Sequence, residues 1–192
     1  MKKGITVASV VLFSFLLLIL GCQSAPEKEL ASAKDVLQKA QESEADKYAP
    51  DLFNQANDSI TEAENLIASK KYGEAKQLLI NAKGVAESAI SQAQVNKDET
   101  KTQVEDFLAA LENAVKQLSE AQDKAKQWKI PEDVWKLTEE TARWDQMITR
   151  AKAEYEAGNY YLAKQLCAQA HQEITQKDNQ LRGMIVAKEG KK

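Results

Sequence analysis

Apolar residues recur at alternating spacings of three and four along most of this chain, from Leu30 to Ile185. Only an α-helix brings positions with this spacing onto one face. The whole chain has only seven Gly and three Pro, and β-branched runs long enough to form a strand are absent. The sequence therefore predicts an all-α fold.

Few breakpoints divide the pattern into helices. A proline disfavours helical geometry in the residue before it and is tolerated in a first helical turn. Gly-containing segments mark further turns. These signals predict five helices, separated at Tyr48-Ala49-Pro50, at Ser69 to Gly73, at Pro131 and at Gly158-Asn159.

The third helix is expected to be long. Its apolar stripe keeps its phase from Leu79 to Ala125, and only the polar stretch Asn96 to Thr102 interrupts it. One continuous helix of roughly 55 residues fits this pattern. The alternative is a loop at Asn96 to Thr102.

Two halves of the chain resemble each other. Leu37 to Gln41 matches Leu118 to Gln122 at an offset of 81, and Pro50 matches Pro131 at the same offset. The heptapeptide that begins at Tyr72 matches the one that begins at Tyr160, at an offset of 88. The difference of seven is about two helical turns, so the middle helices of the second copy are expected to be longer.

Short turns make neighbouring helices antiparallel, and each apolar stripe must be covered by other helices. We therefore expect two antiparallel three-helix units in tandem, residues 29–96 and 97–188, which share the long central helix. The last residues, 189–192, are expected to fray. The arrangement is similar to spectrin-type repeats, and this architectural analogy implies no function.

The N-terminus has the features of an export signal. Lys2 and Lys3 precede the apolar segment Ile5 to Leu20, so residues 1–21 are predicted to be a signal peptide. The motif Ile19-Leu20-Gly21-Cys22 resembles the lipobox of bacterial lipoproteins, although Leu20 is bulkier than usual. That resemblance implies acyl chains on Cys22 that hold the protein on a membrane, with residues 22–28 as a tether. The alternative is an uncleaved signal anchor.

Charge and sorting signals limit the partners. Loss of Lys2 and Lys3 leaves 24 basic and 29 acidic residues, a net charge of −5, which argues against a nucleic-acid partner. No Asp follows Cys22, which is similar to the pattern of lipoproteins sent to an outer membrane. The protein is expected there, facing the periplasm, if the host has two membranes.

A resemblance to a known family covers roughly residues 30–95. The residues that carry it are Ala45, Tyr48-Ala49-Pro50, Ala56, Ala63, Tyr72, Ala75, Ala82 and Ala86. They resemble an uncharacterised domain of bacterial envelope lipoproteins, which is catalogued as a domain of unknown function. The resemblance implies an envelope location and a helical fold, and brings no activity. Residues Tyr155 to Tyr160 also resemble tetratricopeptide repeats, but a period above 80 argues against such an array.

Three tryptophans lie near Pro131. Trp144 is on the apolar seam and is expected in the core, whereas Trp128 and Trp135 flank the seam. Core packing is the favoured interpretation for these two, and the alternative is an aromatic surface that binds a sugar or a partner helix.

The fifth helix carries Cys167 and His171 four residues apart. His171 is the only histidine, so a metal site would need further ligands, and none is predicted. Cys167 is on the seam and is expected to be a buried, inert thiol, with oxidative dimerisation as the alternative. Glu173 and Asp178 are expected to be surface carboxylates.

No nucleophile elbow, P-loop, dinucleotide fingerprint or zinc motif occurs in the sequence. We therefore expect a protein that is not an enzyme and needs no cofactor. The leading hypothesis is a structural or protein-interaction module of the bacterial envelope, with an envelope protein or the cell wall as partner. The alternative is a helical carrier that holds an amphiphile between its helices.

Overall fold

The computed structural model describes residues 24–190, and every regular element in this range is a helix. The predicted signal segment and the predicted lipidation site at Cys22 lie outside the described residues. The packing divides into two compact units, the first ending at Gln92 and the second beginning at Ala93. The all-α prediction is confirmed for the described range. The finer prediction of two tandem three-helix units, with its domain boundaries, stays a prediction.

The long helix is confirmed. Helix α5 runs without a break over Tyr72–Gln127, 56 residues. Thr100 explains why the polar stretch within it does not become a loop. Its side chain is buried on the seam, and its hydroxyl donates to the carbonyl oxygen of Asn96 at 2.6 Å. The helix itself therefore satisfies the one polar group that the seam buries there.

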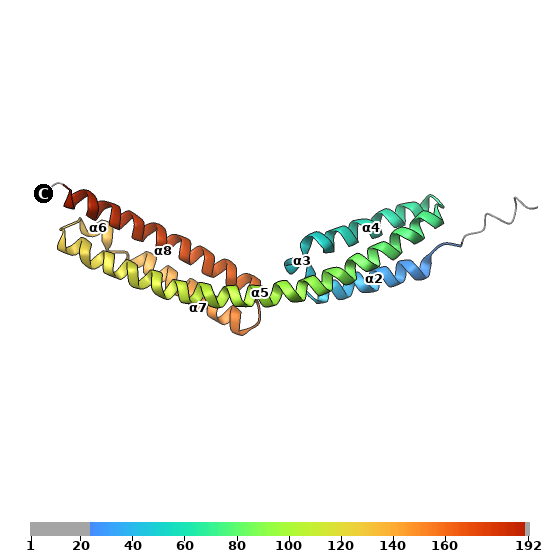
Figure 1. Cartoon of the computed structure of the whole chain (residues 1–192), viewed down its shortest axis with the longest axis horizontal. Helices are drawn as coiled ribbons and strands as arrows, with labels where there is room; N and C mark the ends of the chain where they lie inside the picture. Colours follow the sequence, from blue (N-terminus) through green and yellow to red (C-terminus); the bar gives the residue numbers. More distant parts are fainter. Residues whose placement is uncertain (1–23, 191–192) are drawn as a thin grey trace, which may run out of the picture. The chain divides into compact units, whose positions relative to one another are not determined.

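The first unit consists of three helices and the N-terminal part of α5. Helix α2 spans Glu27–Glu42, α3 spans Ala45–Tyr48 and α4 spans Pro50–Ala68. Helices α2 and α4 lie alongside α5 (Figure 1). Their shared core is rich in alanine and includes Ala33, Val36, Ala56, Ile60, Ala63, Leu79, Ala82 and Ala86. Alanines at these positions let the helix backbones approach closely.

The second unit consists of the C-terminal part of α5 and three further helices. They are α6 over Glu132–Trp135, α7 over Thr138–Glu156 and α8 over Tyr160–Glu189. Helices α7 and α8 pack against each other, and both lie alongside α5 (Figure 1). The core here includes larger side chains, among them Leu111, Leu118, Trp144, Ile174 and Leu181. The predicted core position of Trp144 is confirmed, since 2% of this residue is exposed.

Two predicted helices are shorter than expected. The first ends at Glu42 rather than Tyr48, because Glu44 adopts a left-handed backbone with φ of 58°. The fourth does not run on from Pro131, since α6 ends at Trp135 and α7 begins at Thr138. Glutamate is an uncommon left-handed residue, so no sequence signal marked the first break.

The predicted lengthening of the middle helices is wrong. Helices α4 and α7 have 19 residues each. The starts of α4 and α7 differ by 88 residues, as do the starts at Tyr72 and Tyr160. The seven additional residues therefore lie before α7, in the end of α5 and the connection through α6. Pro50 opens α4, whereas Pro131 precedes α6, so the two prolines are not structurally equivalent.

The prediction that Asp178 is a surface carboxylate is also wrong. Only 7% of Asp178 is exposed, and it lies on α8 between the buried Ile174 and Leu181. Its Oδ2 accepts from Arg182 Nε at 2.7 Å, and its Oδ1 has no hydrogen-bond partner. A carboxylate at a seam position is costly to desolvate when one oxygen stays unpaired.

Replacing this carboxylate by an apolar side chain is expected to stabilise the protein. At the offset of 88, the first unit has Ile90 at the position of Asp178. We expect Asp178→Ile to raise the free energy of unfolding by about 1–2 kcal/mol, because Arg182 is partly exposed and can reach water. Urea unfolding followed by circular dichroism measures this change. Asp178→Asn is the control of similar shape, and a loss of stability in Asp178→Ile would contradict the account.

Candidate functional site

An open groove of ≈250 Å³ lies between α5 and α7 in the second unit. Its lining residues are Leu108, Leu111, Glu112, Val115, Ile148 and Lys152. Leu108 and Ile148 are half-buried, and 40% of Val115 is exposed. An apolar strip between two charged side chains is a candidate surface for docking a partner.

Helix geometry produces this groove from the sequence. Leu108, Leu111 and Val115 are spaced three and four apart on α5, so they share one face. Ile148 and Lys152 are four apart on α7 and face the same gap. The two helices run in opposite directions. Tyr155 donates to Glu105 near one end, and Gln122 Nε2 donates to the Trp135 carbonyl near the other at 2.7 Å.

The positions that the sequence offsets assign to this groove in the first unit carry an ion pair. The offsets of 81 and 88 relate Val115 to Lys34 and Lys152 to Glu64. Lys34 Nζ lies 2.6 Å from Glu64 Oε1, across α2 and α4. The counterpart of Ile148 is Ile60, which is only 4% exposed, whereas Ile148 is half-buried. The second unit thus presents apolar surface where the first has a charged pair over a buried isoleucine.

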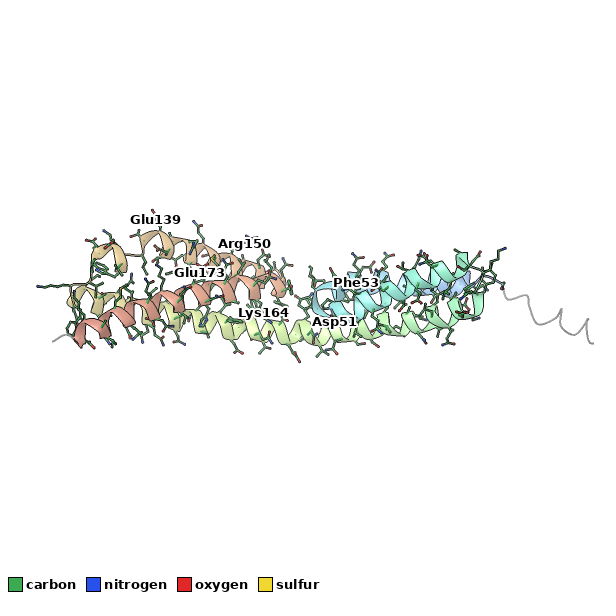
Figure 2. All side chains as sticks on the ribbon, turned by 90° about the horizontal axis from the view of Figure 1, so that it is seen from above. Asp51, Phe53, Glu139, Arg150, Lys164 and Glu173 are labelled. Carbon is green, nitrogen blue, oxygen red and sulfur yellow. The ribbon has the colours of Figure 1, made fainter. Side chains whose placement is uncertain are left out.

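A polar cluster joins α7 to α8 near the core. Glu173, which Figure 2 labels on α8, is half-buried and accepts from Trp144 Nε1 at 2.9 Å. It also accepts from Arg143 Nη2 and from Gln169 Nε2. Donation from Trp144, followed by that from Gln169, holds the pKa of this carboxyl below its usual value. The cluster satisfies the indole N–H that burial of Trp144 would otherwise leave unpaired, so its role is structural.

Trp128 and Trp135 lie near the turn at Pro131, and both are half-buried against the core of the second unit. Trp135 Nε1 donates to the carbonyl oxygen of Ile130 at 3.1 Å. Lys126 Nζ lies 4.9 Å from the centre of the Trp135 ring, within the range of a cation–π contact. These contacts account for Trp135 as part of the turn. A role for either tryptophan in binding a partner stays a prediction.

An aromatic pair lies at the opposite end of α7. The Tyr155 and Tyr160 rings are 5.4 Å apart between centroids. The hydrogen bond that the Tyr155 hydroxyl donates to Glu105 raises the pKa of Tyr155 to about 12. This tyrosine stays neutral at physiological pH and links α7 to α5 just beyond the groove.

Cys167 is buried as expected, with 0% exposure. Burial raises the pKa of its thiol, which makes the nucleophilic thiolate scarcer. His171 packs edge-on against Phe107 at 6.3 Å between ring centroids. Within residues 24–190, no three side chains among His, Cys, Asp and Glu come together as metal ligands.

Sequence reasoning missed the groove because each of its residues fits an ordinary helical pattern. Leu111 and Val115 follow the stripe of α5, and Ile148 follows that of α7. The available signal was the comparison of the two halves, in which an apolar Val115 occupies the position of Lys34. The comparison requires knowing which offset applies to which pair of helices, and the helix boundaries in the structure supply this assignment.

The part of the chain that the structure describes has no helix long and apolar enough to cross a membrane. No curated protein and no solved structure matches the chain. Residues 28–106 match the family model of a domain of unknown function, DUF4398. The α5–α7 groove lies beyond the matched residues. The resemblance found in the sequence is confirmed to this extent: the chain contains a DUF4398 domain of unknown function.

Proposed function

We propose that this chain is a non-catalytic interaction module of the bacterial envelope, anchored to its membrane by acyl chains on Cys22. Two antiparallel three-helix units that share α5 form the module, and the groove of the second unit binds a partner. The observation that carries the proposal is the apolar lining at Val115 and Ile148, where the first unit has the Lys34–Glu64 ion pair.

The groove supports a binding role for a physical reason. The exposed surface of Val115 is apolar, and its contact with water is unfavourable. A partner that buries this surface gains about 25 cal/mol of binding free energy for each Å² removed from water. Glu112 and Lys152 at the rim give direction to such a contact, because charges at an interface set orientation more than affinity. The partner is therefore expected to carry both an apolar ridge and charged groups, as the side of a protein helix does.

The anchor is proposed from the lipobox residues Ile19 to Cys22. Two or three acyl chains make membrane attachment stable, since each buried methylene contributes about 0.8 kcal/mol. Gln23 after the cysteine is compatible with an outer-membrane location facing the periplasm in a host with two membranes. The negative net charge of the mature chain disfavours nucleic acid as a ligand.

A carrier of an amphiphile is the second candidate function. The observation that favours it is the same groove, in which apolar walls lie beside the Lys152 ammonium group. An acyl chain would lie against Leu108 and Val115 with an anionic headgroup at Lys152. Glu112 weakens this alternative, since it would face the same headgroup.

Lipid attachment is tested by the Cys22→Ser variant. The wild-type protein is expected to partition into detergent and to show a mature mass that includes acyl chains. The variant is expected to stay in the aqueous phase with no such mass, because the acylated thiol is absent. Intact-mass spectrometry and phase partitioning measure both properties. An unmodified, freely soluble wild-type chain would rule out the anchor.

The groove is tested by a photo-crosslinking amino acid placed at Val115 in living cells. Because the side chain at this position is partly exposed, the substitution is expected to change stability by at most about 0.5 kcal/mol. We expect a crosslinked protein adduct from position 115. The matched control is the same amino acid at Lys34, its counterpart in the first unit, which is expected to give none.

Mass spectrometry of the adduct separates the two functions. A polypeptide attached at position 115 supports the interaction module, whereas an attached lipid supports the carrier. Equal labelling at positions 115 and 34, or no adduct at either, would contradict a binding role for the groove.

A further inference from the structure

We propose that the α5–α7 groove of the second unit is the contact between two copies of this chain, related by a local twofold axis. In this contact Glu112 of each copy faces Lys152 of the other. The inference rests on the proposed function and names the partner of the same groove.

The groove has the apolar surface that a contact requires. Val115 is among the exposed large apolar residues of the described chain, and the half-buried Leu108 and Ile148 lie beside it. A second α5 laid antiparallel along the gap would place its own Val115 and Leu108 against these side chains. Both copies would then cover the same patch, which is what a twofold interface requires.

The two rim charges, Glu112 and Lys152, are not paired with each other or with another charged residue among those that the structure describes. In the described residues, neither Glu112 nor Lys152 forms a hydrogen bond or an ion pair. They lie on opposite walls of the groove, one on α5 and one on α7. In a twofold contact, residue i meets residue j, and j meets i. Glu112 on one wall and Lys152 on the other can form two such reciprocal ion pairs, one on each side of the twofold axis.

The helix register separates the two charges of one chain by about one helical turn. Glu105 pairs with Tyr155, and Gln122 pairs with the carbonyl of Trp135, so Lys152 lies near the level of Leu108. Glu112 is one helical turn further along α5. A twofold axis that passes α5 midway between Leu108 and Glu112 therefore brings Glu112 of one copy level with Lys152 of the other.

Comparison with the first unit indicates that the rim charges of the second unit find their ion-pair partners in another chain. There, a Lys–Glu pair joins the two walls within one chain, through Lys34 and Glu64. In the second unit, Val115 occupies the position of the lysine, and Lys152 occupies the position of the glutamate. The ion pair of the first unit therefore has no counterpart at these positions, and a second copy supplies two pairs between Glu112 and Lys152.

Other occupants fit the two charges less well. A single-chain anionic amphiphile satisfies Lys152 but faces Glu112 with a like charge. A foreign helix would need a matching ridge and both complementary charges, whereas a second copy already carries them. A stable interface buries roughly 1,200–2,000 Å², and this groove has a volume of only ≈250 Å³, so we expect association to be weak in solution. Confinement to one membrane raises the effective concentration of the copies.

Charge reversal tests this inference on the full acylated chain. Sedimentation equilibrium in density-matched neutral detergent measures its self-association. Glu112→Lys alone and Lys152→Glu alone each bring like charges together at two places. We expect each to weaken self-association by about ten- to a hundredfold, because 1.4 kcal/mol corresponds to a factor of ten.

Two combinations are expected to restore association. In an equimolar mixture of the two single variants, the lysine introduced at position 112 of one copy would face the glutamate introduced at position 152 of the other. The unchanged Lys152 of the first copy would face the unchanged Glu112 of the second. The double variant, which exchanges the two charges within one chain, is likewise complementary to itself.

The matched control is Lys34→Glu, which breaks the ion pair of the first unit. It changes the net charge by as much as Lys152→Glu does, and it is expected to leave self-association unchanged. Circular dichroism verifies that every variant is folded.

The outcomes separate this inference from the proposed function. A wild-type chain that is monomeric at every concentration, or a mixture that fails to restore association, would overturn the twofold contact. If position 115 nevertheless crosslinks to a different polypeptide, the interaction module stands with another partner. If position 115 captures nothing, the proposed function fails as well.

Discussion

The long helices of the described chain bury narrow apolar stripes, and α5 supplies such a stripe to both units. Its seam residues Ala75, Leu79 and Ala82 belong to the first unit, and Val104, Leu111 and Leu118 belong to the second. Thr100 bridges the two stretches, because its hydroxyl is satisfied by its own helix. Since most of the stability of a helix in a protein comes from packing its apolar face, the continuity of the stripe through a polar segment is what allows one helix to serve two cores.

The two cores solve the packing problem with side chains of different size. At the offset of 88, Ala56 in the first unit corresponds to Trp144 in the second, and Ala86 corresponds to Ile174. Large side chains hold helices further apart than alanine does. They also bring polar groups that need partners, and Glu173 is the acceptor that the Trp144 indole requires. The open groove and the buried Asp178 both belong to the unit with the larger core side chains.

The sequence predicted what depends on periodicity. The spacing from Leu79 to Ala125 correctly indicated one helix, and the seam positions of Trp144 and Cys167 correctly indicated burial. Lys70, Lys129 and Gly158 all adopt positive φ after a helix. In each case the next N–H bonds the carbonyl five residues back, as in a Schellman turn. These three turns lie at breakpoints that the sequence predicted. The prediction failed at Glu44, a left-handed residue with no glycine or proline beside it.

Asp178 and Val115 show a second limit of sequence reasoning. A carboxylate at a helical spacing indicates solvent, and a valine at a helical spacing indicates core, yet here the aspartate is buried and the valine is partly exposed. What decides each case is the neighbouring helix, and no pattern within one helix contains that information. The comparison of the two units does contain it, because Ile90 and Lys34 show what the same positions hold in a unit that closes its own gaps. At a buried position, the second unit has the charged Asp178 where the first has the apolar Ile90. At a partly exposed position, it has the apolar Val115 where the first has the charged Lys34. Two such exchanges in opposite directions do not improve the fold of the second unit on its own, and the exposed one is explained if that face is covered by a partner.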